Sequence, residues 1–345
     1  MVTASDRKKV LTFGELLIRM SPDSESDWLK SNNLPVYVGG AEANVASALA
    51  KWEIPTAYFS AVPENVLSRQ LVKYLQEKKI DTSPMLFQGD KLGIFYLHQG
   101  TDMKNTSVIY DRRNSSFADL KPTDIDWDNF FRDVSWFHFS AICPAITQSA
   151  ADVCLEAVKI ASQKNINVSL DLNYRSKLWQ YGREPVDVLP EIAGYCNLIM
   201  GNIWAAEKML GISFKQDITS ESSKEVFLAQ AEYTSKAIIE KFSKVTAVAN
   251  TFRFDYKDRG IRYYTTLFAN DSSYLSREYF AEEIVDKVGS GDCFMAGLIY
   301  GYYKQLPGQQ ILDFATAAAF KKLFEKGDST AHNVEEIKGF LENGQ

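Results

Sequence analysis

Residues 286–297 read Asp-Lys-Val-Gly-Ser-Gly-Asp-Cys-Phe-Met-Ala-Gly, a turn of small residues that runs directly into an apolar helical pattern. The glycines let the backbone bend tightly and leave amide N–H groups uncovered. At the start of a helix these N–H groups have no partner within the helix, and the helix dipole adds partial positive charge. The stretch therefore predicts an anion site suited to a phosphate group, formed by Gly289, Ser290 and Gly291.

Asp292 follows this turn and is expected at the mouth of the anion site. A carboxylate there can accept the proton of an incoming hydroxyl while the amides hold the phosphoryl group in transfer. The alternative interpretation is that Asp292 only caps the helix and that the glycines only form a turn. The stretch is not a Walker P-loop, because the lysine and the serine or threonine that should follow are absent.

A second glycine pair, Gly39 and Gly40, precedes the run Ala-Glu-Ala-Asn-Val-Ala-Ser-Ala at 41–48. One interpretation is close packing of a helix on a sheet, which small residues permit. The other is close approach of the Gly40 backbone to a ligand, with Asn44 as a polar contact. The residues alone leave both interpretations open.

Short β-rich runs alternate with helical patterns from about residue 55 onward, which is typical of a parallel sheet flanked by helices. The predicted strands are 56–62, 136–142, 166–172, 197–200 and 245–249. The predicted helices are 66–79, 149–164, 205–210, 293–304, 309–325 and 334–341. The pattern indicates an α/β protein.

Two segments break the alternation, at about 14–38 and 91–116. Strand-like runs at 11–20 and 34–38 have no helix between them, and the second segment holds two more runs joined by a polar loop. We expect these runs to pair as a small antiparallel sheet that forms a lid over a site at the strand ends. An ordinary edge hairpin is the alternative.

The composition excludes several classes of protein. A formal net charge of -6 argues against a broad nucleic-acid surface. No stretch is apolar enough for a signal peptide or a membrane span, so we expect a cytoplasmic protein without a membrane partner. The four cysteines are scattered and form no C-x-x-C pair, which favours reduced thiols over disulfides or zinc. The three histidines have no metal-ligand spacing.

The two glycine stretches resemble the signatures of the ribokinase-like (PfkB) carbohydrate kinases. Residues 39–46 resemble the N-terminal signature and residues 286–297 the C-terminal one, and the resemblance runs from about Val10 to Leu341. It implies one kinase domain over 1–345 with a three-layer α/β sandwich, a mostly parallel central sheet and a small β-sheet lid. It also implies ATP and Mg²⁺ as cofactors, and homodimerisation through the lid as one mode of assembly.

Within that family the resemblance is closest to 2-keto-3-deoxygluconate kinases. The segments that carry it are 108–112, 136–142, 169–175, 178–179 and 325–328. It implies that Gly40 approaches the sugar acid through its backbone, and that Tyr110 and Arg112 come from the lid to meet the keto-acid end. Arginine suits this role because its fork can hold a carboxylate in two hydrogen bonds.

The same resemblance implies roles for three more residues. Arg175 would lie between substrate and phosphates, where a fixed positive charge offsets charge in the transition state. Asp328 would hydrogen-bond a substrate hydroxyl. A lid tyrosine is expected in the strand near residue 96; Tyr96 is the tyrosine there, but Phe95 is adjacent, and strand parity decides which one faces inward. The structural alternatives are a solvated charge for Arg112, core packing for Tyr110, pairing with Asp171 for Arg175, and a turn cap for Asp328.

Two positions depart from the family's pattern. The family usually has Asn-x-x-Glu after the strand that ends near residue 200; here Asn202 is followed by Ala205 at the glutamate's place, and Glu207 is off register. The family often has Lys-x-Gly near the nucleotide, where this chain has Thr251 and Arg253, a variant that occurs among related kinases. The expected nucleotide-binding residues are Asn202, Thr251, Arg253, Gly289 and Gly291.

These observations together favour ATP-dependent phosphorylation of a sugar or sugar acid at a primary hydroxyl. The leading expectation is conversion of 2-keto-3-deoxygluconate to its 6-phosphate, with Asp292 as the general base. One alternative keeps the chemistry and changes the substrate to fructose or another sugar or sugar acid. Another is a catalytically weakened relative that binds a sugar without turnover, which Ala205 motivates.

Overall fold

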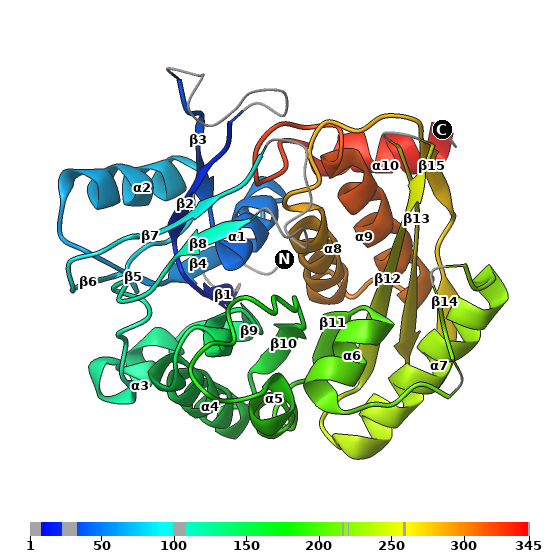
Figure 1. Cartoon of the computed structure of the whole chain (residues 1–345), viewed down its shortest axis with the longest axis horizontal. Coiled ribbons are helices and arrows are strands. Elements are labelled where there is room, and N and C mark those ends of the chain that lie inside the picture. Colours follow the sequence, from blue (N-terminus) through cyan, green and yellow to red (C-terminus); the bar gives the residue numbers. More distant parts are fainter. Residues whose placement is uncertain are drawn as a thin grey trace, which may run out of the picture.

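The computed structural model describes residues 8–22, 33–98, 108–215, 217–219, 221–257 and 260–343. Its central sheet is built from β1 (Lys9–Phe13), β4 (Thr56–Phe59), β9 (Val134–Ser140), β10 (Asn167–Asp171), β11 (Leu198–Gly201), β12 (Ala247–Tyr256), β13 (Gly260–Ala269), β14 (Ser272–Leu275) and β15 (Tyr279–Ala281) (Figure 1). The strand order is β14-β13-β12-β11-β10-β9-β1-β4, with β15 beside β13. All pairs from β4 to β12 are parallel, and β13, β14 and β15 extend the sheet in antiparallel fashion.

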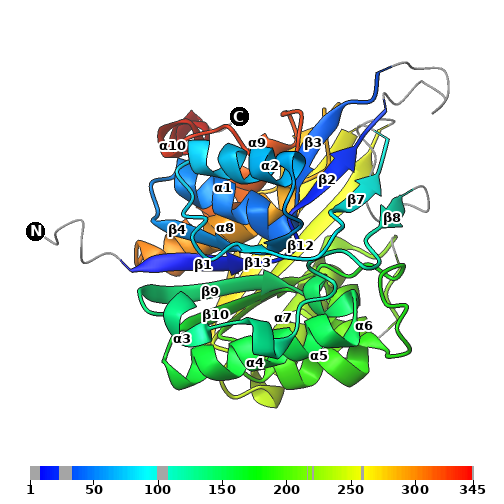
Figure 2. The ribbon, with the colours of Figure 1, turned by 90° about the vertical axis from the view of Figure 1, so that its left-hand side faces the viewer.

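Helices cover both faces of this sheet, so the chain has three layers (Figure 2). The upper layer in Figure 2 contains α1 (Ala41–Lys51), α2 (Val66–Glu77), α8 (Ser290–Tyr303), α9 (Gly308–Lys322) and α10 (Val334–Asn343). The lower layer contains α3 (Trp127–Phe130), α4 (Gln148–Gln163), α5 (Pro185–Ala193), α6 (Ile203–Leu210) and α7 (Lys224–Lys241). The expected α/β sandwich is confirmed. Within the described ranges, no helix has both the length and the apolar character needed to cross a membrane.

The sandwich follows from strands that are apolar on both faces. Val10 and Trp136 point into the core beneath α1, α8 and α9, whereas the next residues, Leu11 and Phe137, point into the core above α4, α5 and α6. Successive side chains on a strand alternate between faces, so an unbroken apolar run can fill two cores. Burial on both sides explains why these strands read as continuous apolar segments in the sequence.

A smaller sheet stands at one edge of the central sheet. It consists of β3 (Val36–Gly39), β2 (Leu17–Met20), β7 (Gly93–Tyr96) and β8 (Ile109–Asp111), in that order. We call these four strands the lid sheet. It is mixed rather than wholly antiparallel, because β2 and β7 run parallel. The run predicted at 11–20 is divided: its first part is β1 of the central sheet, and only its second part belongs to the lid. A separate parallel pair, β5 (Ala61–Val62) and β6 (Leu86–Phe87), lies beside it.

Several elements lie outside the sequence prediction. Helix α7 was missed because its buried face carries polar residues, among them Gln230 and Thr234, which weaken the apolar periodicity. Helix α5 begins at one proline and contains another, Pro190, which is a poor signature for a helix. Strand β13 is buried at eight of its ten positions and shows no alternation.

Candidate active site

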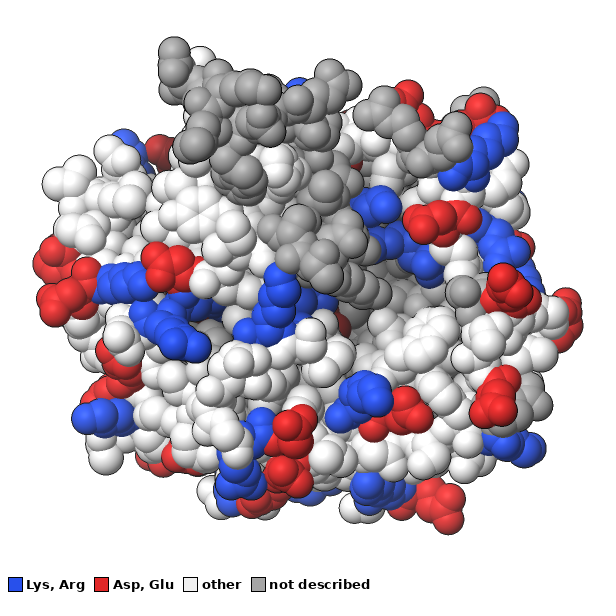
Figure 3. Space-filling view, viewed as in Figure 1, with Lys and Arg blue, Asp and Glu red and all other residues white. Residues whose placement is uncertain are grey.

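A cavity opens where the parallel strands end, between the lid sheet and the start of α8. Figure 3 shows this face hollowed near its centre, with Lys and Arg side chains on both sides of the hollow. The predicted site residues meet there: the lining includes Gly40, Asn44, Tyr110, Arg112, Arg175, Asn202, Thr251, Arg253, Gly289, Ser290, Gly291, Asp292 and Asp328. Ligands of open α/β sheets bind in this position, outside the carboxyl ends of the strands.

The turn before α8 has the geometry predicted for an anion site. Gly289 is the N-cap, with φ 80° in the left-handed region, and a Cβ atom there would lie 1.8 Å from the carbonyl oxygen of Asp328. Glycine is therefore required at this position. A Cβ at Gly291 would meet nothing within 4 Å, so the space above this residue is open. The hydroxyl of Ser290 points away from that space and donates to the carbonyl oxygen of Ala319 at 3.1 Å.

Asp292 lies in the first turn of α8 and is only 8% exposed. Its Oδ2 accepts a hydrogen bond of 2.7 Å from the side-chain amide of Asn44 on α1. Burial raises the pKa of the Asp292 carboxyl well above its usual range; the negative charges of Asp171 and Glu42 add to this, while Asn44 and Arg175 oppose it. A carboxylate with a raised pKa is better matched to accepting a proton near neutral pH. The Asn44 contact fixes its direction.

Arg175 follows β10 and lines the same cavity. Its Nη1 donates to the carbonyl oxygen of Tyr174 at 2.9 Å. Its Nε is buried and, in the described part of the chain, has no hydrogen-bond partner. Asp171, which the structural alternative named as the partner of Arg175, accepts a hydrogen bond of 3.0 Å from the amide of Asn173. A guanidinium with a buried donor in a cavity is suited to binding an anion.

Arg112 is buried and forms an ion pair with Glu15, through its Nε and the Oε2 of the carboxylate. Burial works against the guanidinium's charge, but the carboxylate of Glu15 outweighs it and raises the pKa of Arg112. This contact excludes the alternative of a solvated loop charge. Glu15 was not singled out in the sequence, although it is one of two charged residues in the otherwise apolar run 11–20.

The parity of β7 places Phe95, not Tyr96, in the cavity. Phe95 is buried and lines the cavity next to Tyr110, with ring centroids 6.3 Å apart. Tyr96 is absent from the lining and lies on the other face of the strand. The predicted substrate contact of Tyr96 therefore has no support in the geometry. The reason is the period of two along a strand, which the sequence could not anchor to either face.

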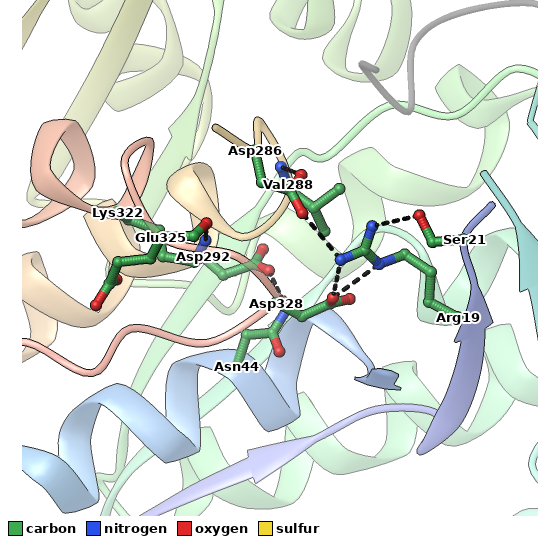
Figure 4. A network of polar contacts seen from close by, with 9 residues as sticks. All are labelled: Arg19, Ser21, Asn44, Asp286, Val288, Asp292, Lys322, Glu325 and Asp328. Carbon is green, nitrogen blue, oxygen red and sulfur yellow. Dashed lines mark hydrogen bonds and ion pairs between the residues drawn. The ribbon is translucent and has the colours of Figure 1, made fainter. Parts of the chain in front are cut away.

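Asp328 belongs to a buried polar network that joins the lid sheet to the turn before α8 (Figure 4). Its Oδ1 accepts from the Nε of Arg19 at 2.8 Å, and Nη2 of the same guanidinium lies 3.0 Å from Asp286. Asp286 in turn accepts from the amide of Val288 at 3.0 Å. Burial raises the pKa of Asp328 to about 6, against the opposing charge of Arg19. Asp328 thus lines the cavity, but one of its oxygens is already engaged.

Glu42 is a further buried carboxylate at the cavity that the sequence prediction left without a role. It lies in the first turn of α1, and its Oε1 accepts from the amide of Ser140 at 2.8 Å. Burial raises the pKa of Glu42. A Cβ atom at Gly14 would fall 1.9 Å from its Oε2, so the glycine makes room for this side chain. Its proximity is one cause of the raised pKa of Asp292.

The other predicted nucleotide-binding residues, besides Gly289 and Gly291, also line the cavity. Asn202 caps α6 by accepting from the amide of Ala205 at 2.8 Å, and Ala205 itself lines the cavity. Thr251 and Arg253 come from β12. Glu207 is not part of the lining, so it does not replace the missing glutamate in position.

Comparison with known proteins decides the family. The pfkB family carbohydrate kinase domain matches residues 7–334. The chain belongs to the PfkB carbohydrate kinases. Its sequence is 30% identical to that of 2-dehydro-3-deoxygluconokinase from Thermotoga maritima. The crystal structure of that protein is similar to this one with a TM-score of 0.88, over 97% of this chain and 100% of that one. The chain is 24% identical to the 2-dehydro-3-deoxygalactonokinase of Haloferax volcanii, over 97% of each chain.

A more distant structure shares the fold of this PfkB kinase. It is a ribokinase II from E. coli in complex with ATP and Mg²⁺, 18% identical, with a TM-score of 0.74 over 97% of this chain and 99% of that one. The chain is thus a carbohydrate kinase with a ribokinase-like fold, related to 2-keto-3-deoxygluconate kinases. The predicted family, fold and enzyme class are confirmed.

Proposed function

We propose that this kinase transfers the γ-phosphoryl group of ATP to the 6-hydroxyl of 2-keto-3-deoxygluconate. The observation that carries the proposal is the position of Asp292: a buried carboxylate held by Asn44, one residue after the open backbone at Gly291. Its relation to the anion site is the one that phosphoryl transfer to a hydroxyl requires. The relatives named for the two epimeric dehydro-deoxy sugar acids support a substrate of this class.

Each step of the proposed reaction is assigned to a residue of the cavity. Asp292 accepts the proton of the attacking hydroxyl, and its raised pKa makes it a stronger base than an exposed carboxylate. The amides of Gly289, Ser290 and Gly291 at the start of α8 stabilise negative charge on the phosphoryl group. Arg175, which lines the same cavity and has a buried donor available, stabilises the same charge.

ATP and Mg²⁺ are part of the proposal. Asn202, Thr251 and Arg253 would meet the nucleotide. The described residues contain no group of three His, Cys, Asp or Glu side chains placed to hold a metal ion. Mg²⁺ in such sites is usually held by one or two carboxylates together with substrate phosphates and water, and Asp171 at the end of β10 is a cavity carboxylate that could serve. The ion, when bound, neutralises charge on the phosphates.

A coupled assay of ADP release with the purified chain tests the proposal. We expect ATP-dependent turnover on 2-keto-3-deoxygluconate, and a loss on the order of 10²-fold or more in Asp292→Ala. Activity that survives intact in Asp292→Ala would remove Asp292 from the mechanism. Turnover on other sugars but not on this acid would contradict the proposed substrate, while the proposed phosphoryl transfer would still stand.

A neutral sugar such as fructose is the second candidate substrate, and one observation favours it. Arg112 already has a carboxylate partner, Glu15, so its charge is balanced before any acid binds. Arg112→Ala separates the two candidates: KM should rise sharply for a sugar acid and little for a neutral sugar. Arg113→Ala is the matched control, because Arg113 is adjacent in sequence, exposed and outside the cavity lining.

A further inference from the structure

Glu15 occupies the short connection between β1 and β2, where the chain passes from the central sheet into the lid sheet. Its side chain is 2% exposed, and Arg112, which follows β8, is 7% exposed. Oε2 of Glu15 accepts the Nε–H of Arg112. Both residues line the cavity, so their ion pair forms part of its wall.

The second oxygen of this carboxylate has no such partner. Oε1 of Glu15 is buried and accepts no hydrogen bond from any described residue. Buried acceptors in folded proteins are nearly always satisfied, because an unmade hydrogen bond loses the hydration it had in water. Since Glu15 lines the cavity, a molecule bound there is the available source of a donor.

Two glycines lie against Glu15, one at its carboxylate and one at its backbone. A Cβ atom at Gly93 would lie 2.2 Å from Oε1. A Cβ at Gly40, whose φ is 131°, would lie 2.6 Å from the carbonyl oxygen of Glu15. Any larger residue at either position would displace Glu15. Gly93 therefore leaves room for the carboxylate of Glu15, and Gly40 leaves room for its backbone carbonyl.

We propose that Glu15 is a specificity-determining residue whose Oε1 accepts a hydrogen bond from one substrate hydroxyl, beside the group that Arg112 binds. The proposal rests on the sugar kinase activity proposed above and names a contact within that site. A carboxylate at this point selects for a hydroxyl hydrogen and against a second anionic group, because like charges repel in a buried site. Arg112 then binds a hydrogen-bond acceptor of the substrate, and Glu15 binds a neighbouring hydroxyl that donates.

The rival explanation is that Glu15 only balances the charge of Arg112. In that case removal of its charge would weaken every substrate to the same degree. The proposal instead expects a selective effect, confined to substrates that carry the hydroxyl in question. The two are separated by measuring kcat/KM for the substrate and for its monodeoxy analogues, in the unmodified chain and in Glu15→Gln.

In the unmodified chain we expect one analogue to lose roughly 10- to 100-fold in kcat/KM, the range for a hydrogen bond to a charged group. In Glu15→Gln that same penalty should shrink to within about threefold, because the charge-assisted bond is gone. The penalties of the other analogues should stay as they were. Asp111→Asn is the matched control: this lid carboxylate pairs with Lys91 and is outside the cavity lining, so all penalties should persist.

The proposal would be overturned if the loss in kcat/KM of every analogue relative to the substrate were the same in Glu15→Gln as in the unmodified chain. It would also be overturned if Glu15→Gln lowered kcat/KM by the same factor for the substrate and for all analogues. If Glu15→Gln fails to fold, Glu15→Asp supplies the same comparison, since it keeps the charge opposite Arg112 and withdraws the oxygen by one methylene. Failure of the proposed function shows separately, as absence of turnover on 2-keto-3-deoxygluconate in the unmodified chain. The deoxy series is then made on whichever sugar the chain phosphorylates.

Discussion

The guanidinium of Arg19 and the carboxylate of Asp328 form a fully buried ion pair of 2.7 Å between residues 309 positions apart in the chain. Arg19 comes from the lid strand β2, and Asp328 comes from the segment after α9. The carbonyl oxygen of Asp328 lies directly against Gly289. The guanidinium also lies 4.2 Å from the ring centroid of Tyr37 on β3. A single side chain thus ties two lid strands to the turn of the anion site.

Arg19→Gln should destabilise the chain strongly. It leaves two buried carboxylates, Asp286 and Asp328, without their cation, and breaking a buried pair in this way typically costs about 3–5 kcal/mol. Urea unfolding measures the loss. Arg69→Gln is the control, because the Arg69 pair with Glu64 is exposed to solvent and should contribute little to stability. Equal losses in the two variants would contradict the role assigned to the network.

Asp292→Asn should make the chain more stable at alkaline pH while it loses activity. Burial raises the pKa of Asp292, so the folded chain favours the protonated carboxyl. The unfolded chain ionises at a lower pH, and Asp292 therefore reduces the free energy of unfolding as the pH rises above about 4. Asparagine cannot ionise, so the variant should be more stable than the unmodified chain at pH 8 and little different at pH 4. Urea unfolding at both values tests this; equal gains at pH 4 and pH 8 would refute it.

Gly289 and Gly291, in the turn before α8, should respond differently to substitution by alanine. Gly289→Ala places a methyl group against the Asp328 carbonyl at a positive φ, so we expect a lower Tm together with lost activity. Gly291→Ala meets no protein atom within 4 Å, so Tm should stay unchanged while the methyl group occupies the space of the phosphoryl group. Thermal unfolding and ADP release measure both effects. Full activity in Gly291→Ala would argue against an anion at this point.

Homodimerisation through the lid remains a prediction, and the edge strands of the lid sheet support it. Val36 on β3 and Ile109 on β8 are 58% and 55% exposed. Val36→Asp should convert a dimer to a monomer, because it places a charge in an apolar contact. Light scattering after size exclusion gives the mass. Val186→Asp, an exposed position on α5, is the control, and a monomeric mass for the unmodified chain would exclude the dimer.

The sequence predicted the α/β class, and most of the candidate site residues it named line one cavity, because glycine turns and apolar runs are local signals. Gly289 and Gly40 are recognisable from their neighbours alone, and both adopt the positive φ that favours glycine. The contacts of Glu15 and Arg19 were not predictable, since each partner lies far along the chain and nothing local marks the pairing. The sequence also could not show whether Phe95 or Tyr96 points into the cavity, because these two adjacent aromatic residues are compatible with either register of the strand.

The lid and the central sheet are joined at residues 14–16, between the end of β1 and the start of β2. The middle residue of this connection, Glu15, forms a buried ion pair with Arg112. The next charged residue along the chain, Arg19, forms a buried ion pair with Asp328. These two buried ion pairs restrict the movement of the lid sheet relative to the central sheet. Outward rotation of the lid sheet would separate these charges and expose them to water and counter-ions, so the rate of lid opening should depend on salt concentration.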